Sequence, residues 1–242
     1  MSIISGSAAI STTGSSGFYD FPIGQSLMFD GSSYLSRTFS SDANRTTMTF
    51  SFWSKQTKLG VSSQIFSSGG NVSDQIFFGN NDIFRIYLAT AYRIETTQLF
   101  RDLAAWNHFV ISIDTPNTNV KLYQNGVQIA TGSIPLGSGN SPIVTKLNDN
   151  ITHYIGRYAA TNSEHYNGYL AEINFIDGTA LTPASFGETK NGVWTPKDPS
   201  GLTYGTNGFR LTFENDGTTN TISGNDFVDQ STNSNNWTAT GF

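Results

Sequence analysis

The sequence predicts an all-β fold with little helix, and both its composition and its periodicity indicate this. Aromatic residues make up 13% of the chain, mostly as 18 phenylalanines, while charged residues reach only 13%. Gly, Ser, Thr and Asn crowd the intervening stretches, which is typical of many short strands joined by polar turns. No stretch shows the sustained apolar spacing of an amphipathic helix. With 242 residues and no cysteine, we expect one main domain whose stability comes from packing.

Strand-length segments bounded by turn-forming residues follow one another along the middle of the chain. They cover residues 26–31, 48–55, 64–68, 74–88, 108–114, 120–132, 152–158 and 168–178. Asn125 and Gly126 tolerate the positive φ values of a type I′ turn, so residues 120–132 are predicted to form a tight hairpin. Pro183 and Gly187 indicate one short helical turn, and residues 209–215 a late strand.

The chain divides into three parts. Residues 1–25 form a Ser/Gly/Thr-rich arm, residues 26–190 carry the strand pattern, and residues 191–242 contain a Pro/Gly linker, a late closing strand and a polar tail. Two interpretations stay open for residues 205–242. They either close the sandwich by pairing with the first strand or begin a second unit.

The charge pattern argues against several classes of protein. Lys and Arg total 13 against 18 Asp and Glu, a net charge of −5, and the basic residues are scattered singly. This disfavours a nucleic-acid groove. No apolar run approaches the roughly 18 residues of a membrane span, and the N-terminus lacks the features of a signal peptide. We therefore expect a soluble, non-secreted product.

Three motifs carry a family resemblance. They are the strand Trp106-Asn107-His108-Phe109-Val110, the Tyr-x-Asn-Gly hairpin at 123–126 and the Asp-Gly-x-Ala-Leu turn at 177–181. Together they make residues 26–190 resemble the laminin-G-like branch of the concanavalin A-like lectin/glucanase superfamily. The resemblance implies a jelly-roll sandwich of two antiparallel sheets, with ligands bound at the concave face or the loop rim.

The longer frame is similar to proteins that tailed bacteriophages of marine bacteria carry on their virions. It runs from SGFYDFPIGQSLMFDGSS through ETTQLFRDLAAW to GVWTPK and YGTNGF. The resemblance implies a virion structural protein, as fibre, spike or capsid-surface decoration, made in the host cytoplasm. We expect residues 1–20 to attach it to other virion proteins or to a neighbouring copy through Ile3, Ile4 and Ile10, in a homo-oligomeric or multi-copy arrangement. A free carbohydrate-binding lectin and an active β-glucanase are the alternatives.

The strand at residues 168–178 is close to the Glu-x-Asp-x-x-Glu strand with which β-glucanases cut polysaccharides. Alternation places Glu172 and Asn174 on the face away from the core. Hydrolysis with retention needs two carboxyl groups about 5 Å apart. Asn174 cannot ionise, and Asp177 has the wrong parity unless a bulge intervenes. We therefore predict no catalytic residue and no enzymatic activity.

A carbohydrate site needs an exposed aromatic ring and polar groups that read hydroxyls. The loop at residues 156–168 supplies both kinds of group, and the candidate carbohydrate-binding residues are Arg157, Tyr158, Asn162, Glu164, His165 and Tyr166. The alternative is a long polar connection whose aromatic rings are half-buried at the edge of a sheet.

Two Asn/Asp clusters offer the hard oxygen ligands that calcium prefers. The candidate ligands are Asn80, Asp82, Asn148 and Asp149. Asx turns explain such clusters without an ion, so no cofactor is required and Ca²⁺ stays an option. The three histidines are far apart in sequence, which argues against a zinc or nucleophile-base site. We expect His108 to be a structural imidazole bonded to the backbone.

Overall fold

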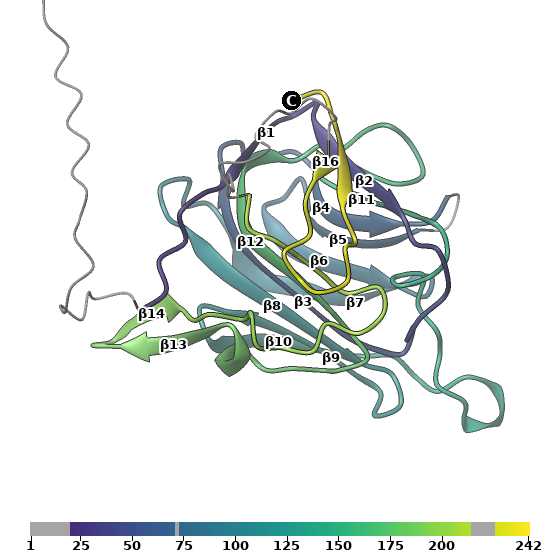
Figure 1. Cartoon of the computed structure of the whole chain (residues 1–242). Coiled ribbons are helices and arrows are strands. Elements are labelled where there is room, and N and C mark those ends of the chain that lie inside the picture. Colours follow the sequence, from purple (N-terminus) through teal and green to yellow (C-terminus); the bar gives the residue numbers. More distant parts are fainter. Residues whose placement is uncertain (1–19, 71–72, 214–225) are drawn as a thin grey trace, which may run out of the picture.

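The computed structural model describes residues 20–70, 73–213 and 226–242, and in these ranges two large antiparallel sheets form a sandwich (Figure 1). The predicted all-β jelly-roll fold is confirmed. Helix is limited in these ranges to two short 3₁₀ turns, η1 (Ser138–Asn140) and η2 (Pro183–Ser185), and the second is the helical turn predicted from Pro183. No helix in the described ranges is long and apolar enough to cross a membrane.

The first sheet has seven strands in the order β1-β12-β3-β8-β9-β10, with β15 also paired to β12. Its strands are β1 (Leu27–Asp30), β3 (Thr47–Gln56), β8 (Asn107–Asp114), β9 (Asn119–Gln124), β10 (Val127–Ser133), β12 (Asn167–Asp177) and β15 (Phe209–Leu211). β1 and β15 pair with successive halves of β12, as the partners Leu27↔Leu170 and Phe209↔Phe175 show. The late strand therefore closes the sheet against β12 and not against the first strand.

The second sheet has eight strands in the order β16-β17-β2-β11-β4-β5-β6-β7. Its strands are β2 (Tyr34–Thr38), β4 (Ser63–Ser68), β5 (Asp74–Phe78), β6 (Ile83–Leu88), β7 (Ala91–Leu99), β11 (Thr152–Ile155), β16 (Asp226–Phe227) and β17 (Trp237–Thr240). β17 pairs with β2, so the yellow C-terminal segment of Figure 1 is part of this sheet. Residues 205–242 therefore contribute β15 to the first sheet and β17 to the second, although neither strand pairs with β1 as the first interpretation required.

Phenylalanines fill the space between the two sheets. Phe50 and Phe52 point inward from β3 and Phe109 from β8, while Phe66 reaches them from β4. The Phe50 and Phe66 rings stack with their centroids 4.7 Å apart. Trp237 of β17 belongs to the same core and is 0% exposed.

A second, smaller apolar cluster lies on the outer face of the first sheet. Val110 and Ile176 project outward from β8 and β12 and pack beneath Phe186 and Tyr204. The covering segment includes η2 and a two-stranded hairpin, β13 (Gly187–Lys190) with β14 (Val193–Pro196). It leaves part of this outer face open.

The hairpin between β9 and β10 forms as predicted. Asn125 has a φ of 48° and Gly126 a φ of 81°, which are the two positive values that a type I′ turn requires. The strands missed by the sequence pattern are polar or short. β7 is an edge strand rich in Thr, Glu and Gln, and β17 has the sequence WTAT within a polar tail.

Candidate functional site

The predicted carbohydrate loop, residues 156–168, lies on the outer side of the eight-stranded sheet. Its arginine side chain stacks on two tyrosine rings. The Arg157 guanidinium is 4.1 Å from the ring centroid of Tyr154 and 4.8 Å from that of Tyr34. The backbone N–H of Tyr158 donates to the carbonyl of Ser163 at 2.9 Å, so the loop folds back on itself. The loop is thus an ordered surface feature of the sandwich.

The other polar members of the loop also bond within the protein. Gln64 Nε2 donates to Glu164 Oε2 at 2.8 Å, and His165 Nε2 lies 3.2 Å from Asn162 Oδ1. Burial and the nearby positive charge of Arg157 lower the pKa of His165. Asn162 and Glu164 are exposed, so a role for this loop in carbohydrate binding stays a prediction.

Tyr166 cannot take part in such a surface. Its side chain is 0% exposed, its hydroxyl lies 2.7 Å from Ser54 Oγ, and its ring packs against Phe29. Burial raises the pKa of its hydroxyl. The expectation that Tyr166 offers a ring to a sugar is therefore wrong, because the residue directly before β12 turns into the core.

A β-bulge in β12 sets the direction of Glu172. The register against β3 shifts between Ala171 and Asn174, and Glu172 has a φ of 44°. Both Leu170 and Ile173 point into the core, although strict alternation would place Leu170 beside Glu172. After the bulge, Glu172 and Asn174 face away from the core, as predicted.

The outward-facing carboxylate of Glu172 is held in a buried ion pair. Arg210 Nε donates to Glu172 Oε1 at 2.6 Å, and both side chains are buried. Burial is the largest single influence and opposes the charge of Arg210, but the hydrogen bond to Glu172 together with the electrostatic attraction of Glu172 and Asp198 outweighs it and raises the pKa of Arg210. The hydroxyl of Tyr204 donates to Asn174 Oδ1 at 2.6 Å. These contacts hold the side chains of Glu172 and Asn174 in hydrogen bonds within the fold.

The carboxylate of Asp177 is a structural clamp. It accepts hydrogen bonds from the backbone N–H groups of Asn44, Thr206 and Asn207 at 2.9–3.1 Å. The side-chain amide of Asn148 donates to it as well, at 2.6 Å. Asp177 therefore joins three loops at the end of β12.

The candidate calcium ligands form two groups at opposite ends of β5. Asn80 and Asp82 follow its last residue, whereas Asn148 and Asp149 belong to the loop that contacts its first residue, Asp74. Among the described residues, no three His, Asp or Glu side chains gather where they could hold a metal.

The two acidic candidates for calcium binding already have protein partners. The Asp82 carboxylate accepts from the Gly60 N–H and from Arg101 Nε, each at 2.8 Å, and these bonds lower its pKa. Asp149 forms an ion pair with Arg45 at 3.0 Å. Calcium binding by these residues stays a prediction.

Three of the four tryptophans lie around a groove on the outer face of the first sheet. Trp53 comes from β3, Trp106 from the loop directly before β8, and Trp194 from β14. Alternation along β3 explains why Trp53 points outward while its neighbour Phe52 enters the core. The groove has a volume of about 540 Å³.

His108 supports the aromatic groove from below. Its ring stacks on Trp53 at a centroid distance of 5.0 Å, and the Trp194 indole N–H donates to its Nδ1 at 3.1 Å. Since Nδ1 accepts, Nε2 carries the proton and donates to Ser51 Oγ at 2.9 Å. Burial lowers the pKa of His108 to about 3, so the ring is neutral. The structural role is confirmed, but its partners are side chains and not the backbone.

Two glycines fix the position of Trp194. A Cβ at Gly126 or at Gly187 would lie 2.4 Å from the Trp194 ring. Gly126 thus serves both the type I′ turn and the close approach of the indole. The ring that forms one wall of the groove is clamped between the β9–β10 hairpin and the start of β13.

The lining of the groove is uncharged. Ala171 and Pro196 complete its protein wall, and residues 22–26 form the opposite side. Among the described residues that line it, none carries a charge, and Gln25 and Ser26 supply the polar side chains. Trp106 is 38% exposed, so part of its indole is accessible to solvent.

Sequence reasoning missed this groove because its tryptophans come from three distant segments. The one available signal was the shared strand parity of Trp106 and His108 in a motif already singled out. The position of Trp194 depends on the β13–β14 hairpin, which the strand pattern of the sequence did not predict. Predicted attachment residues Ile3, Ile4 and Ile10 lie outside the described residues.

A model of the laminin G branch, described as the concanavalin A-like lectin/glucanases superfamily, matches residues 29–185. The chain belongs to this superfamily. No curated protein sequence matches this member. The family expected from the Trp106–Val110 strand and the Tyr-x-Asn-Gly hairpin is thereby confirmed.

Solved structures share the lectin-like sandwich. A carbohydrate-binding candidate from Bacteroides ovatus superposes with a TM-score of 0.61 at 17% identity, over 90% of this chain and 59% of that one. The chain thus spans little more than half of that protein. Domain 4 of a Geobacillus stearothermophilus arabinanase, in complex with arabinotriose, gives a TM-score of 0.49 at 18% identity, over 68% and 76%. A heptameric pentraxin from Limulus polyphemus gives 0.47 at 16%, over 65% and 77%.

Proposed function

We propose that the sandwich is a non-catalytic carbohydrate-binding domain whose tryptophan groove holds a neutral glycan. The observation that carries this proposal is the groove itself. Trp53, Trp106 and Trp194 line it, its volume is about 540 Å³, and its described lining carries no charge. Known small-molecule sites have this size and this mostly apolar, aromatic lining with few polar groups.

The chemistry of the lining selects the ligand class. Indole faces pack well against the C–H groups of a pyranose ring, and they contribute large apolar area. A sialic acid or uronic acid would bring a carboxylate that no side chain in the described lining could pair, which costs binding energy. We therefore infer an uncharged glycan.

The same face argues against hydrolysis. Glu172 is paired with Arg210, and the Asp177 carboxylate accepts four hydrogen bonds from surrounding loops. A retaining glycosidase needs two carboxyl groups that are free to reach one glycosidic bond. The name of the Bacteroides ovatus relative, a carbohydrate-binding candidate, supports the binding role.

Replacing Trp106 by alanine is expected to weaken glycan binding at least 30-fold, because truncating a central aromatic contact removes about 2 kcal/mol or more. Trp106 is partly exposed and lies in a loop, so its loss should spare the fold. Affinity gel electrophoresis in laminarin, lichenan and mannan, with alginate as the acidic comparison, measures the effect. The wild type should be retarded by at least one neutral polysaccharide and not by alginate.

The matched control is Tyr92→Ala, which removes an exposed ring from β7 in the other sheet. This variant should bind as the wild type does. If binding survives Trp106→Ala but is lost in Tyr158→Ala, the loop at residues 156–168 is the site and the groove is not. Preference for alginate would contradict the neutral ligand.

We further propose that the domain is displayed in many copies on a bacteriophage particle. The resemblance of its long sequence frame to phage virion proteins supports this, and repeated display would raise the avidity of a shallow groove without new contacts. Residues 1–20 would attach the domain to the particle or to a neighbouring copy.

Mass spectrometry of purified phage particles is expected to find this chain at several copies per particle. Deleting residues 2–17 should leave the melting temperature unchanged and abolish incorporation. Absence of the chain from the particles would contradict the virion role. Normal incorporation of the truncated chain would contradict the attachment role of residues 1–20.

A further inference from the structure

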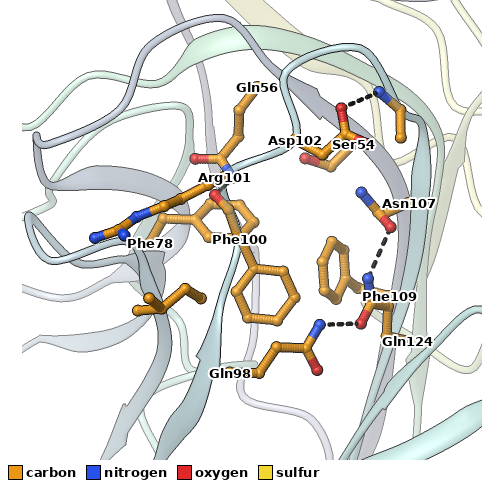
Figure 2. A pocket seen from close by; sticks show the side chains of 12 residues that line it. Ser54, Gln56, Phe78, Gln98, Phe100, Arg101, Asp102, Asn107, Phe109 and Gln124 are labelled. Atoms are coloured by element: carbon orange, nitrogen blue, oxygen red, sulfur yellow. Dashed lines mark hydrogen bonds between the residues drawn. The ribbon is translucent and has the colours of Figure 1, made fainter.

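A second cavity lies at one end of the sandwich, where strands of both sheets stop (Figure 2). Its volume is about 190 Å³. Four side-chain amides line it, from Gln56 at the end of β3, Gln98 in β7, Asn107 at the start of β8 and Gln124 at the end of β9. The loop at residues 100–106 closes one side.

Three of these amides form a hydrogen-bonded relay with a defined direction, drawn as dashed lines in Figure 2. Gln98 Nε2 donates to Gln124 Oε1, and Gln124 Nε2 donates to Asn107 Oδ1, both at 2.7 Å. Asn125 Nδ2 donates to the same Asn107 oxygen at 3.3 Å. The backbone N–H of His108 donates to Asn125 Oδ1, which leaves Asn125 Nδ2 as a donor and thereby sets the direction of the whole relay.

This direction leaves one hydrogen-bond acceptor and one hydrogen-bond donor without a protein partner, at opposite ends of the relay in the described part of the chain. Within the described ranges, no hydrogen bond engages Gln98 Oε1 or Asn107 Nδ2. The first is an acceptor and the second a donor. Since a hydroxyl can both donate and accept, a pair of hydroxyls on one molecule matches the two ends.

The floor of the pocket is apolar and the charges at its mouth are already paired or bonded. Phe78, Phe100 and Phe109 form the floor, with Phe100 and Phe109 centroids 5.5 Å apart. Arg101 is bonded to Asp82, outside the lining, and the Asp102 carboxylate accepts two backbone N–H groups of its own loop. An uncharged occupant with one apolar face and several hydroxyls suits this lining.

Size restricts the occupant further. At about 190 Å³, the cavity is smaller than the roughly 300–1,000 Å³ of sites for drug-sized ligands, yet it exceeds the roughly 30 Å³ of one water several-fold. We propose that this amide pocket is a second, separate binding site that takes one uncharged sugar ring. It does not rest on the tryptophan groove, because none of the described residues lines both cavities.

The test is saturation-transfer NMR with the full chain and a panel of free glucose, galactose, mannose, xylose and arabinose. At least one sugar should bind, with a dissociation constant on the order of millimolar, as expected for so small a contact. Gln98→Ala removes the exposed acceptor end of the relay and should weaken binding at least tenfold. Ala105→Trp, which places an indole at the mouth, should abolish it.

The matched control is Gln128→Ala, which removes an exposed glutamine amide bonded to Thr131 on β10. It should bind as the wild type does, and so should Trp106→Ala. Melting temperatures identify any variant that fails to fold. The proposal is overturned if no sugar of the panel binds, or if folded Gln98→Ala and Ala105→Trp both bind normally.

These outcomes separate the two sites. Loss of monosaccharide binding in Trp106→Ala alone would place the sugar in the groove and overturn the pocket. Monosaccharide binding that depends on Gln98, without retardation by any polysaccharide, would establish the pocket while the proposed role of the groove failed.

Discussion

Replacing Glu172 by alanine is expected to lower the free energy of unfolding by about 3–5 kcal/mol, because it leaves the buried guanidinium of Arg210 with only the more distant, exposed Asp198 at 4.0 Å. The pair is 2.6 Å long, and both side chains are buried on the outer face of the first sheet. Arg210 also donates its backbone N–H to Asp229, so a disturbed Arg210 loosens the C-terminal segment as well. Urea denaturation followed by far-UV circular dichroism measures the loss.

The chain offers a matched control in an exposed Arg–Glu pair. Arg85 and Glu95 are 2.9 Å apart, but Glu95 is 46% exposed, so Glu95→Ala should change stability by less than about 1 kcal/mol. Converting both Glu172 and Arg210 to methionine should recover more than half of the loss, because no charge is then left unpaired. Equal effects of Glu172→Ala and Glu95→Ala would contradict the buried pair.

The same pairing predicts that the wild-type chain releases no reducing sugar from laminarin or lichenan. Release that disappears in a Glu172→Gln variant, assayed at a temperature where that variant is folded, would show that Glu172 is catalytic. Loss of activity through unfolding is excluded by the denaturation curve of the same preparation.

Trp237→Ala is expected to destabilise the chain by about 3–5 kcal/mol, since it empties a large site in the main core. The indole is 0% exposed and its ring lies 4.8 Å from that of Phe209 and 6.2 Å from that of Phe66. It joins a strand of the second sheet to a strand of the first. Far-UV circular dichroism during urea denaturation gives the change.

Trp237→Phe separates packing from the indole nitrogen. In the described part of the chain Nε1 of Trp237 is buried without a hydrogen-bond partner. Phenylalanine removes this unpaired donor while keeping most of the ring, so the loss should be only roughly 1–2 kcal/mol. A chain without residues 226–242 should fail to fold. A stable truncated chain would show that the tail is dispensable.

The C-terminal tail shows why composition does not predict that these residues pack into the sandwich. Residues 226–242 look like a polar terminus, but Asp229 accepts N–H groups from Arg210 and Asn235, and the Asn235 side chain donates to two carbonyls of residues 206–208. These bonds are polar and long-range. Neither hydrophobic periodicity nor turn signals report them.

The candidate site was predicted from sequence only in part. The 156–168 loop is at the surface, as the polar residues between two strands indicated, but Tyr166 is in the core. The tryptophan groove and the amide pocket escaped prediction. Each is assembled from residues on three or more strands or loops, and the register that brings them together is not a local property.

By itself the sequence determined the fold class, the family, the β9–β10 hairpin and the mismatch in the glucanase-like strand. These depend on local patterns, such as alternation, Asn125-Gly126 and the identity of Asn174. Only the tertiary structure decided that Glu172 is locked by Arg210, that Trp53, Trp106 and Trp194 share one groove, and that β17 joins the second sheet beside β2. The physical reason is that a side chain's chemistry depends on its burial and partners, and here those partners are supplied by segments far away along the chain.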